Sequence, residues 1–193
     1  MNRIILLICF SVTIISCNDA AEKTQNKPTE EKKAASFFPV TNYIQGQVAE
    51  IESKGINPMK INTSGNKSDS SWLKVEEFKN AFKEFVTPVI DSSSHVQFFN
   101  ESNFADQSLD TYTFTYAPKG ALPDSILLQR WDVHIDPATN TVKRIFIVKR
   151  TPDNKELQLT WQSGKWCKIV SIKTDKSGKQ SVEHEQTIKW SFD

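Results

Sequence analysis

The most regular pattern of apolar and polar positions lies in the C-terminal half of the chain, from Arg130 to Ile172. Four runs rich in Trp, Val, Ile, Phe and Leu are separated there by three short clusters of turn-forming residues. The clusters are Asp136–Asn140, Pro152–Lys155 and Gln162–Lys165. This arrangement predicts an antiparallel β-meander.

Further strands are predicted on both sides of this region. Leu109–Ala117 alternates with period two and places its aromatic residues on one face. The run 143–150 has an unbroken apolar centre, which predicts a central strand covered on both faces. A last strand is expected to use Ile188, Trp190 and Phe192.

Two helices are predicted before the strands. Phe37–Lys54 carries apolar residues at helical spacing, and Gly55 stands where a left-handed residue ends many helices. Trp72–Val86 carries a largely aromatic stripe and is stopped by Pro88. The intervening Asn62–Ser71 has no apolar residue and is expected to be a loop.

These elements predict an α+β fold, with two N-terminal helices packed on an antiparallel sheet of about six strands. Residues 37–193 suit a single α+β domain of this kind. Twelve Phe and five Trp supply bulky side chains for its core.

The charge of the chain argues against one class of partner. The sequence has 24 basic and 23 acidic residues, and its first 16 residues contain one charge, Arg3, so the remainder is formally neutral. Nucleic-acid binding normally requires a basic surplus or a basic stripe. We therefore expect no nucleic-acid partner.

The N-terminus has the pattern of a secretory signal. A positive start precedes an apolar run, Ile4–Ile15, that is too short to span a bilayer. The residues Ile14-Ile15-Ser16-Cys17 resemble the lipobox of bacterial lipoproteins. The resemblance implies a signal peptide over residues 1–16 and acyl chains, such as palmitate, on Cys17. Residues 18–36 are polar and are expected to be a disordered tether, so that 17–36 form the lipidated cysteine and its linker.

This resemblance also implies a location. Several acyl chains on one residue anchor a protein stably. The domain is therefore expected in the cell envelope, attached through Cys17 to the inner or the outer membrane, and facing the periplasm or the cell surface. Two further segments, Ser36–Thr41 and Leu157–Trp166, are similar to small lipoproteins of Gram-negative bacteria, and Ile135–Val142 resembles hairpins of PepSY-like envelope domains. None of these resemblances implies a particular activity.

The first candidate site lies on one predicted strand. Period two places Asp132, His134 and Asp136 on the same face, where they could bind a divalent cation or act as an acid and base pair. The alternative is an ordinary solvated sheet face, with Asp136 opening a turn.

The second candidate site is aromatic. Tyr112, Phe114, Trp131 and Trp161 could line a pocket for a lipid or another small apolar ligand between the helices and the sheet. The alternative is that they form the core.

The chain contains no recognisable catalytic, cofactor-binding or nucleotide-binding motif. The sequence therefore favours a membrane-anchored envelope lipoprotein that is not an enzyme, needs no cofactor, and acts as a structural module or binds an envelope protein. The alternative is a carrier for a small apolar ligand, and an enzyme is the third hypothesis.

Overall fold

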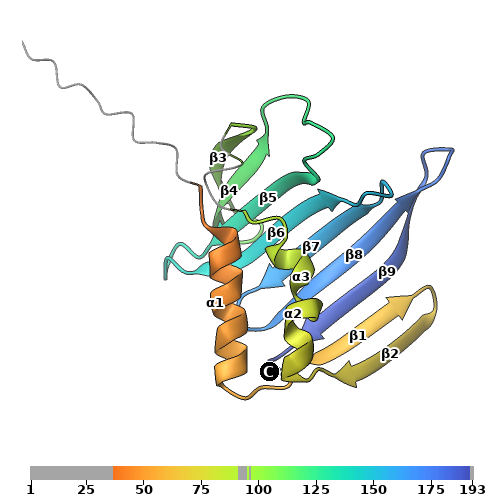
Figure 1. Ribbon diagram of the computed structural model, residues 1–193. Helices are drawn as coiled ribbons and strands as arrows, with labels where there is room; N and C mark the ends of the chain where they lie inside the picture. Colours follow the sequence, from red (N-terminus) through yellow and green to blue (C-terminus); the bar gives the residue numbers. More distant parts are fainter. Residues whose placement is uncertain (1–36, 91–94, 96, 192–193) are drawn as a thin grey trace, which may run out of the picture. The chain divides into compact units, whose positions relative to one another are not determined.

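The computed structural model describes residues 37–90, 95 and 97–191 (Figure 1). These residues form an α+β fold, as predicted, around a nine-stranded antiparallel sheet. The strands are β1 (Met59–Ser64), β2 (Lys67–Trp72), β3 (Phe99–Asp106), β4 (Thr111–Pro118), β5 (Leu128–Ile135), β6 (Val142–Arg150), β7 (Glu156–Gln162), β8 (Trp166–Thr174) and β9 (Gln180–Lys189).

The strand order is β2-β1-β9-β8-β7-β6-β5-β4-β3. Strands β3 to β9 follow one another as a meander, which confirms the predicted arrangement of the C-terminal half. The β1–β2 hairpin joins this meander at its far side, because β1 pairs with the last strand, β9.

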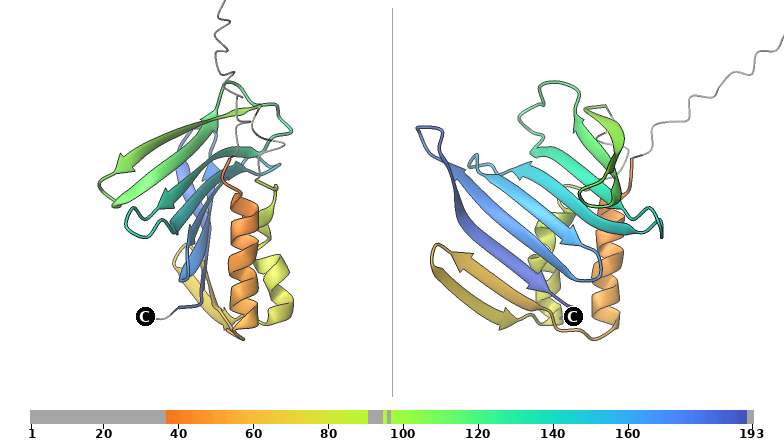
Figure 2. Two further views of the ribbon diagram at one scale, coloured as in Figure 1. Left: turned by 90° about the vertical axis from the view of Figure 1, so that its left-hand side faces the viewer. Right: turned by 180° about the vertical axis from the view of Figure 1, so that it is seen from behind.

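The helical segments lie on one face of the sheet (Figures 1 and 2). They are α1 (Val40–Ser53), the 3₁₀ turn η1 (Val75–Glu77), α2 (Phe78–Ala81) and α3 (Lys83–Val86). In the part of the chain that the structure describes, no helix covers the opposite face, which we call the open face.

Two tryptophans organise the core between the helices and the sheet. The ring of Trp131 stacks on Tyr116, with centroids 4.7 Å apart, and its edges contact Phe37 and Phe99. The ring centroid of Trp161 lies 5.3 Å from that of Phe85 and 5.6 Å from that of Phe82. Both indoles are fully buried. Edge-to-face and offset ring contacts of this kind stabilise beyond the area they bury.

The first predicted helix is confirmed. Val40, Ile44 and Ile51 of α1 are buried against the sheet, as their spacing predicts. The helix ends before Gly55, whose φ of +62° lies in the left-handed region that glycine adopts without strain.

The second predicted helix is wrong in its extent. Trp72 belongs to strand β2, and the helical stretch that follows is interrupted at Phe82, which has φ −98° and ψ 2°. Phe78, Phe82 and Phe85 nevertheless remain buried on the same side. The aromatic stripe therefore predicted the packed face correctly but not the backbone.

The predicted number of strands is too low. Asn62–Ser71 is part of a hairpin that turns at Gly65, which has φ +56°, and is not a loop. Strands β2 and β3 form the two edges of the sheet, and nearly all their residues are exposed. Hydrophobic alternation reveals a strand only when one of its faces is buried, so these polar edges gave no signal.

The central strand β6 is covered on one face only. Ile145 and Ile147 are buried beneath the helices, whereas Phe146 and Val148 on the open face are half-buried. The expectation of a strand covered on both faces is therefore wrong.

Strand β6 also contributes a buried charge. The Nζ of Lys149 donates to the carbonyl oxygen of Glu84 at 2.6 Å, to Glu84 Oε2 at 2.7 Å and to the carbonyl oxygen of Thr87 at 2.7 Å. Burial lowers the pKa of Lys149, and Glu84 partly offsets this effect. The ammonium group thus ties the end of α3 to the sheet and satisfies two carbonyl groups there.

Lys149→Ala is expected to lower the free energy of unfolding by about 2–3 kcal/mol, because it leaves the carbonyl groups of Glu84 and Thr87 without a donor. The carboxylate of Glu84 is 43% exposed and adds little, since water can replace its partner. Urea denaturation measures the change. Lys173→Ala, at an exposed position, should change stability by less than about 0.5 kcal/mol. Equal losses in the two variants would contradict the role of Lys149.

Candidate functional site

The open face carries one continuous row of side chains across the whole sheet. Cross-strand partners share a face, and the pairing connects one residue from each strand. From β2 to β3 the row contains Trp72, Met59, Lys189, Trp166, Gln162, Arg144, His134, Thr113 and Phe104. We call these residues the open-face row.

Two of the sequence-predicted site residues, Asp132 and His134, lie on this face and are buried there. Thr113 Oγ1 lies 2.9 Å from His134 Nδ1 and 3.3 Å from Thr111 Oγ1. No hydrogen bond reaches His134 Nε2 from the residues that the structure describes. The imidazole is therefore held through one nitrogen.

Asp132 is satisfied by its neighbours. Thr115 Oγ1 donates to Asp132 Oδ1 at 2.6 Å, and the Nε of Arg130 donates to the same oxygen at 3.2 Å. The Nη2 of Arg130 lies 3.1 Å from Asp132 Oδ2. Only 6% of the Asp132 side chain is exposed, so this ion pair compensates a carboxylate that water hardly reaches.

Burial of His134 favours the neutral form of its imidazole. Burial lowers the pKa of the imidazole; Asp132 opposes this shift, and Arg144, its partner on β6, adds to it. His134, the Thr113 hydroxyl and the ion-paired Asp132 thus form a polar cluster in which the imidazole is held at Nδ1.

Asp136 does not join this cluster. Its Oδ1 accepts hydrogen bonds from the backbone N–H groups of Ala138 at 2.8 Å and Thr139 at 3.1 Å. These bonds lower the pKa of Asp136 and fix the turn after β5. Among the described residues, no group of three or more His, Cys, Asp or Glu side chains is placed to hold a metal ion.

The four aromatic candidates are not brought together around a cavity. Trp131 and Trp161 are fully buried in the core, Phe114 is half-buried and Tyr112 is 52% exposed. None of them lines any of the larger pockets found among the described residues. The indole N–H groups of Trp131 and Trp161 are buried and lack an acceptor in the described part of the chain.

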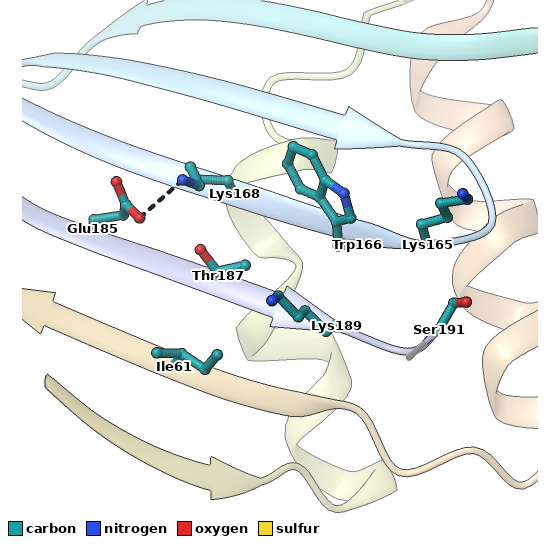
Figure 3. Close-up of a pocket in the computed structure, with 8 residues that line it drawn as sticks. All are labelled: Ile61, Lys165, Trp166, Lys168, Glu185, Thr187, Lys189 and Ser191. Atoms are coloured by element: carbon teal, nitrogen blue, oxygen red, sulfur yellow. Dashed lines mark ion pairs between the residues drawn. The ribbon is translucent and has the colours of Figure 1, made fainter. Parts of the chain in front are cut away.

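The largest of these pockets lies on the open face and was not predicted from the sequence. It is a hollow open to solvent, with a volume of about 720 Å³, over strands β8, β9 and β1. Figure 3 shows its side chains in front of these strands, with the helices behind the sheet: Ile61, Lys165, Trp166, Lys168, Glu185, Thr187, Lys189 and Ser191. We call it the Trp166 pocket.

The pocket is aromatic and basic. Trp166 lies among Lys165, Lys168 and Lys189, and Lys168 Nζ forms an ion pair with Glu185 Oε1 at 2.9 Å. The signal in the sequence was the segment Lys165–Lys168: its Cys167 is buried, so the alternation of a strand places Trp166 and Lys168 on the other face. Burial raises the pKa of the Cys167 thiol, which packs as a small core residue.

The pH dependence of stability tests the His134 cluster. Burial puts the pKa of folded His134 below its ordinary value of 6.5, so the unfolded chain binds more protons as the pH falls through 6.5. Stability is therefore fully present above that value and declines below it. His134→Asn should flatten this decline in urea denaturation series, whereas Thr160→Val, on the same face, should keep it. An unchanged slope in His134→Asn would contradict the assignment.

Comparisons with known proteins identify no relative of this chain. Searches of protein families, of curated proteins and of solved structures found no match to the chain. None of the helices in the described residues has the length and apolar character needed to cross a membrane. The open face, with the Trp166 pocket, is the feature of the described residues that bears most directly on function.

Proposed function

We propose that the chain is a membrane-anchored envelope lipoprotein whose folded domain is a non-catalytic module that binds a protein partner through the open face. The observation that carries this proposal is the Trp166 pocket. An indole and several cations lie in a hollow on the face of the sheet that the helices leave uncovered. The other face is already filled by the core.

The composition of the pocket supports a protein partner. Tryptophan is among the residues that contribute most to protein interfaces, especially when charged and polar groups surround it. Trp166 has such a surrounding, with lysines on both sides and Thr187 and Ser191 at the margin.

The polar cluster on β5, three strands from β8 on the same face, supports binding rather than turnover. Asp132 is occupied by Thr115 and Arg130, and His134 is held by Thr113. A general base must face a space in which a substrate can react, and His134, whose Nε2 has no hydrogen-bond partner among the described residues, lines none of the pockets described above. These residues instead fix the shape of the face on which a partner would dock.

The anchor in this proposal is Cys17, preceded by the signal peptide. A tether of 19 residues, 18–36, reaches about 25 Å if it is flexible, by the rule of 5–6 Å times the square root of its length. This reach would let the open face approach partners near the membrane.

The anchor is tested by labelling cells with a radioactive fatty acid. The full-length chain should incorporate the label, and Cys17→Ala should lose it and leave the membrane fraction, because no acyl chain remains to hold it. Cys167→Ala is the matched control and should retain the label, since that thiol is buried. Label that persists in Cys17→Ala would refute lipidation at this residue.

The open face is tested by mild crosslinking in cells and purification of the full-length protein. We expect a stoichiometric protein partner that is lost in Trp166→Ala and in Lys189→Glu, because both changes remove groups from the Trp166 pocket. Tyr112→Ala is the matched control, since Tyr112 is an exposed aromatic residue on the opposite face by register. Circular dichroism confirms folding. Equal capture by every folded variant would contradict the proposal.

A further inference from the structure

The Trp166 pocket has a surplus of positive charge. It contains three lysines and one carboxylate, Glu185, which is paired with Lys168. No ion pair joins Lys165 or Lys189 to a carboxylate of the described residues. The chain as a whole has nearly equal numbers of basic and acidic residues. The pocket therefore has a charge surplus that the chain as a whole lacks, and electrostatic complementarity favours an anionic occupant.

The positive charge continues along the open-face row. Next to Trp166 come Gln162 and then Arg144, whose Nε donates to Gln162 Oε1 at 3.2 Å. Arg144 forms no ion pair with a carboxylate within the described part of the chain. Arg144 and Lys189 are three strands apart, which corresponds to about 14 Å at the usual strand spacing. A cation thus stands at each end of a segment of the row that has Trp166 between its ends.

The length of this segment distinguishes between anions. Because their backbones stand about 14 Å apart, a ligand that meets both Arg144 and Lys189 with extended side chains must carry two anionic groups separated by a similar distance. An extended peptide repeats its same-face side chains every 6.5–7 Å, so carboxylates four positions apart are also about 13–14 Å apart. The side chain midway between them would lie between Gln162 and Trp166.

We infer that the open-face row between Arg144 and Lys189 binds an extended acidic segment of the partner protein, with one carboxylate on each cation and an apolar side chain beside Trp166. This inference rests on the proposed function, since it names the part of the partner that the pocket recognises. The tether of the chain itself is a poor occupant, because residues 18–36 contain four acidic and four basic residues.

The probe is a short synthetic peptide in which two glutamates flank the sequence Ser-Leu-Ser. Titration of the isotope-labelled full chain by NMR should shift the indole N–H signal of Trp166, which Trp166→Phe identifies. Replacing both glutamates by glutamine should weaken binding about fivefold, within the range that two exposed ion pairs provide. Added salt should lower the affinity of the chain for the glutamate peptide and leave its affinity for the glutamine peptide unchanged.

The matched variants neutralise two charges each. Arg144→Gln with Lys189→Gln should reduce the affinity for the glutamate peptide to that for the glutamine peptide. Lys173→Gln with Lys179→Gln changes the net charge equally, at exposed positions near the other end of β8 and β9, and should bind as the wild type does. Equal weakening in both pairs would overturn the inference, because the effect would then be one of net charge.

Two further outcomes would also overturn the inference. An oligomer of galacturonate that binds more tightly than the peptide, with the same dependence on Arg144 and Lys189, would assign the row to an anionic glycan. The crosslinked partner could instead be lost in Trp166→Ala but kept when Arg144 and Lys189 are neutralised. That outcome would support a protein partner at the Trp166 pocket but would refute its binding through an acidic segment. Loss of the partner in both cases, together with peptide binding, supports the inference.

Discussion

Burial of aromatic rings between the sheet and the helices is the constraint on which the rest of the structure depends. Trp131 and Trp161 project from neighbouring parts of the meander and receive rings from the N-terminal segment and from the helical stretch before Pro88. The helical segments are short or broken, and isolated helices of this length are marginal in water. They persist because their apolar sides complete this core.

The same constraint explains why the two faces of the sheet differ. The helices of the described residues lie on one face, so the other face keeps side chains that no helix covers, both polar ones and apolar ones such as Phe146 and Trp166. Side chains such as Asp132 and Thr113 are buried on that face by their own neighbours. The open face is thus a surface of mixed polar and apolar side chains, with a hollow where Trp166 and the lysines meet, and the core behind it fixes its geometry.

The sequence predicted the elements that bury apolar side chains. Residues of α1 and of the strands β4 to β8 follow periodic patterns because one side of each faces the core. Strands β2 and β3 escaped prediction because edge strands here bury almost nothing, and the backbone break at Phe82 leaves no mark on an otherwise helical aromatic spacing. Asp132 and His134 were correctly placed on one face. Their hydrogen bonds to threonines, however, depend on cross-strand neighbours that lie about 20 residues away in the sequence. The Trp166 pocket requires β9 and β1 beside β8, and a pairing of this kind cannot be read from periodicity.

The pairing of β1 with β9 has a consequence for how the chain reaches its folded state. Met59 and Lys189 are neighbours in the sheet although they stand near opposite ends of the domain sequence. Closing so long a loop lowers the conformational entropy of the chain before the strand contacts form, and contacts of large sequence separation therefore slow folding. The β1–β2 hairpin has no place in the sheet until the last strand has been synthesised and has left the ribosome. A chain with this topology emerges from the ribosome with its sheet incomplete, and it finishes folding only when β9 is available to pair with β1.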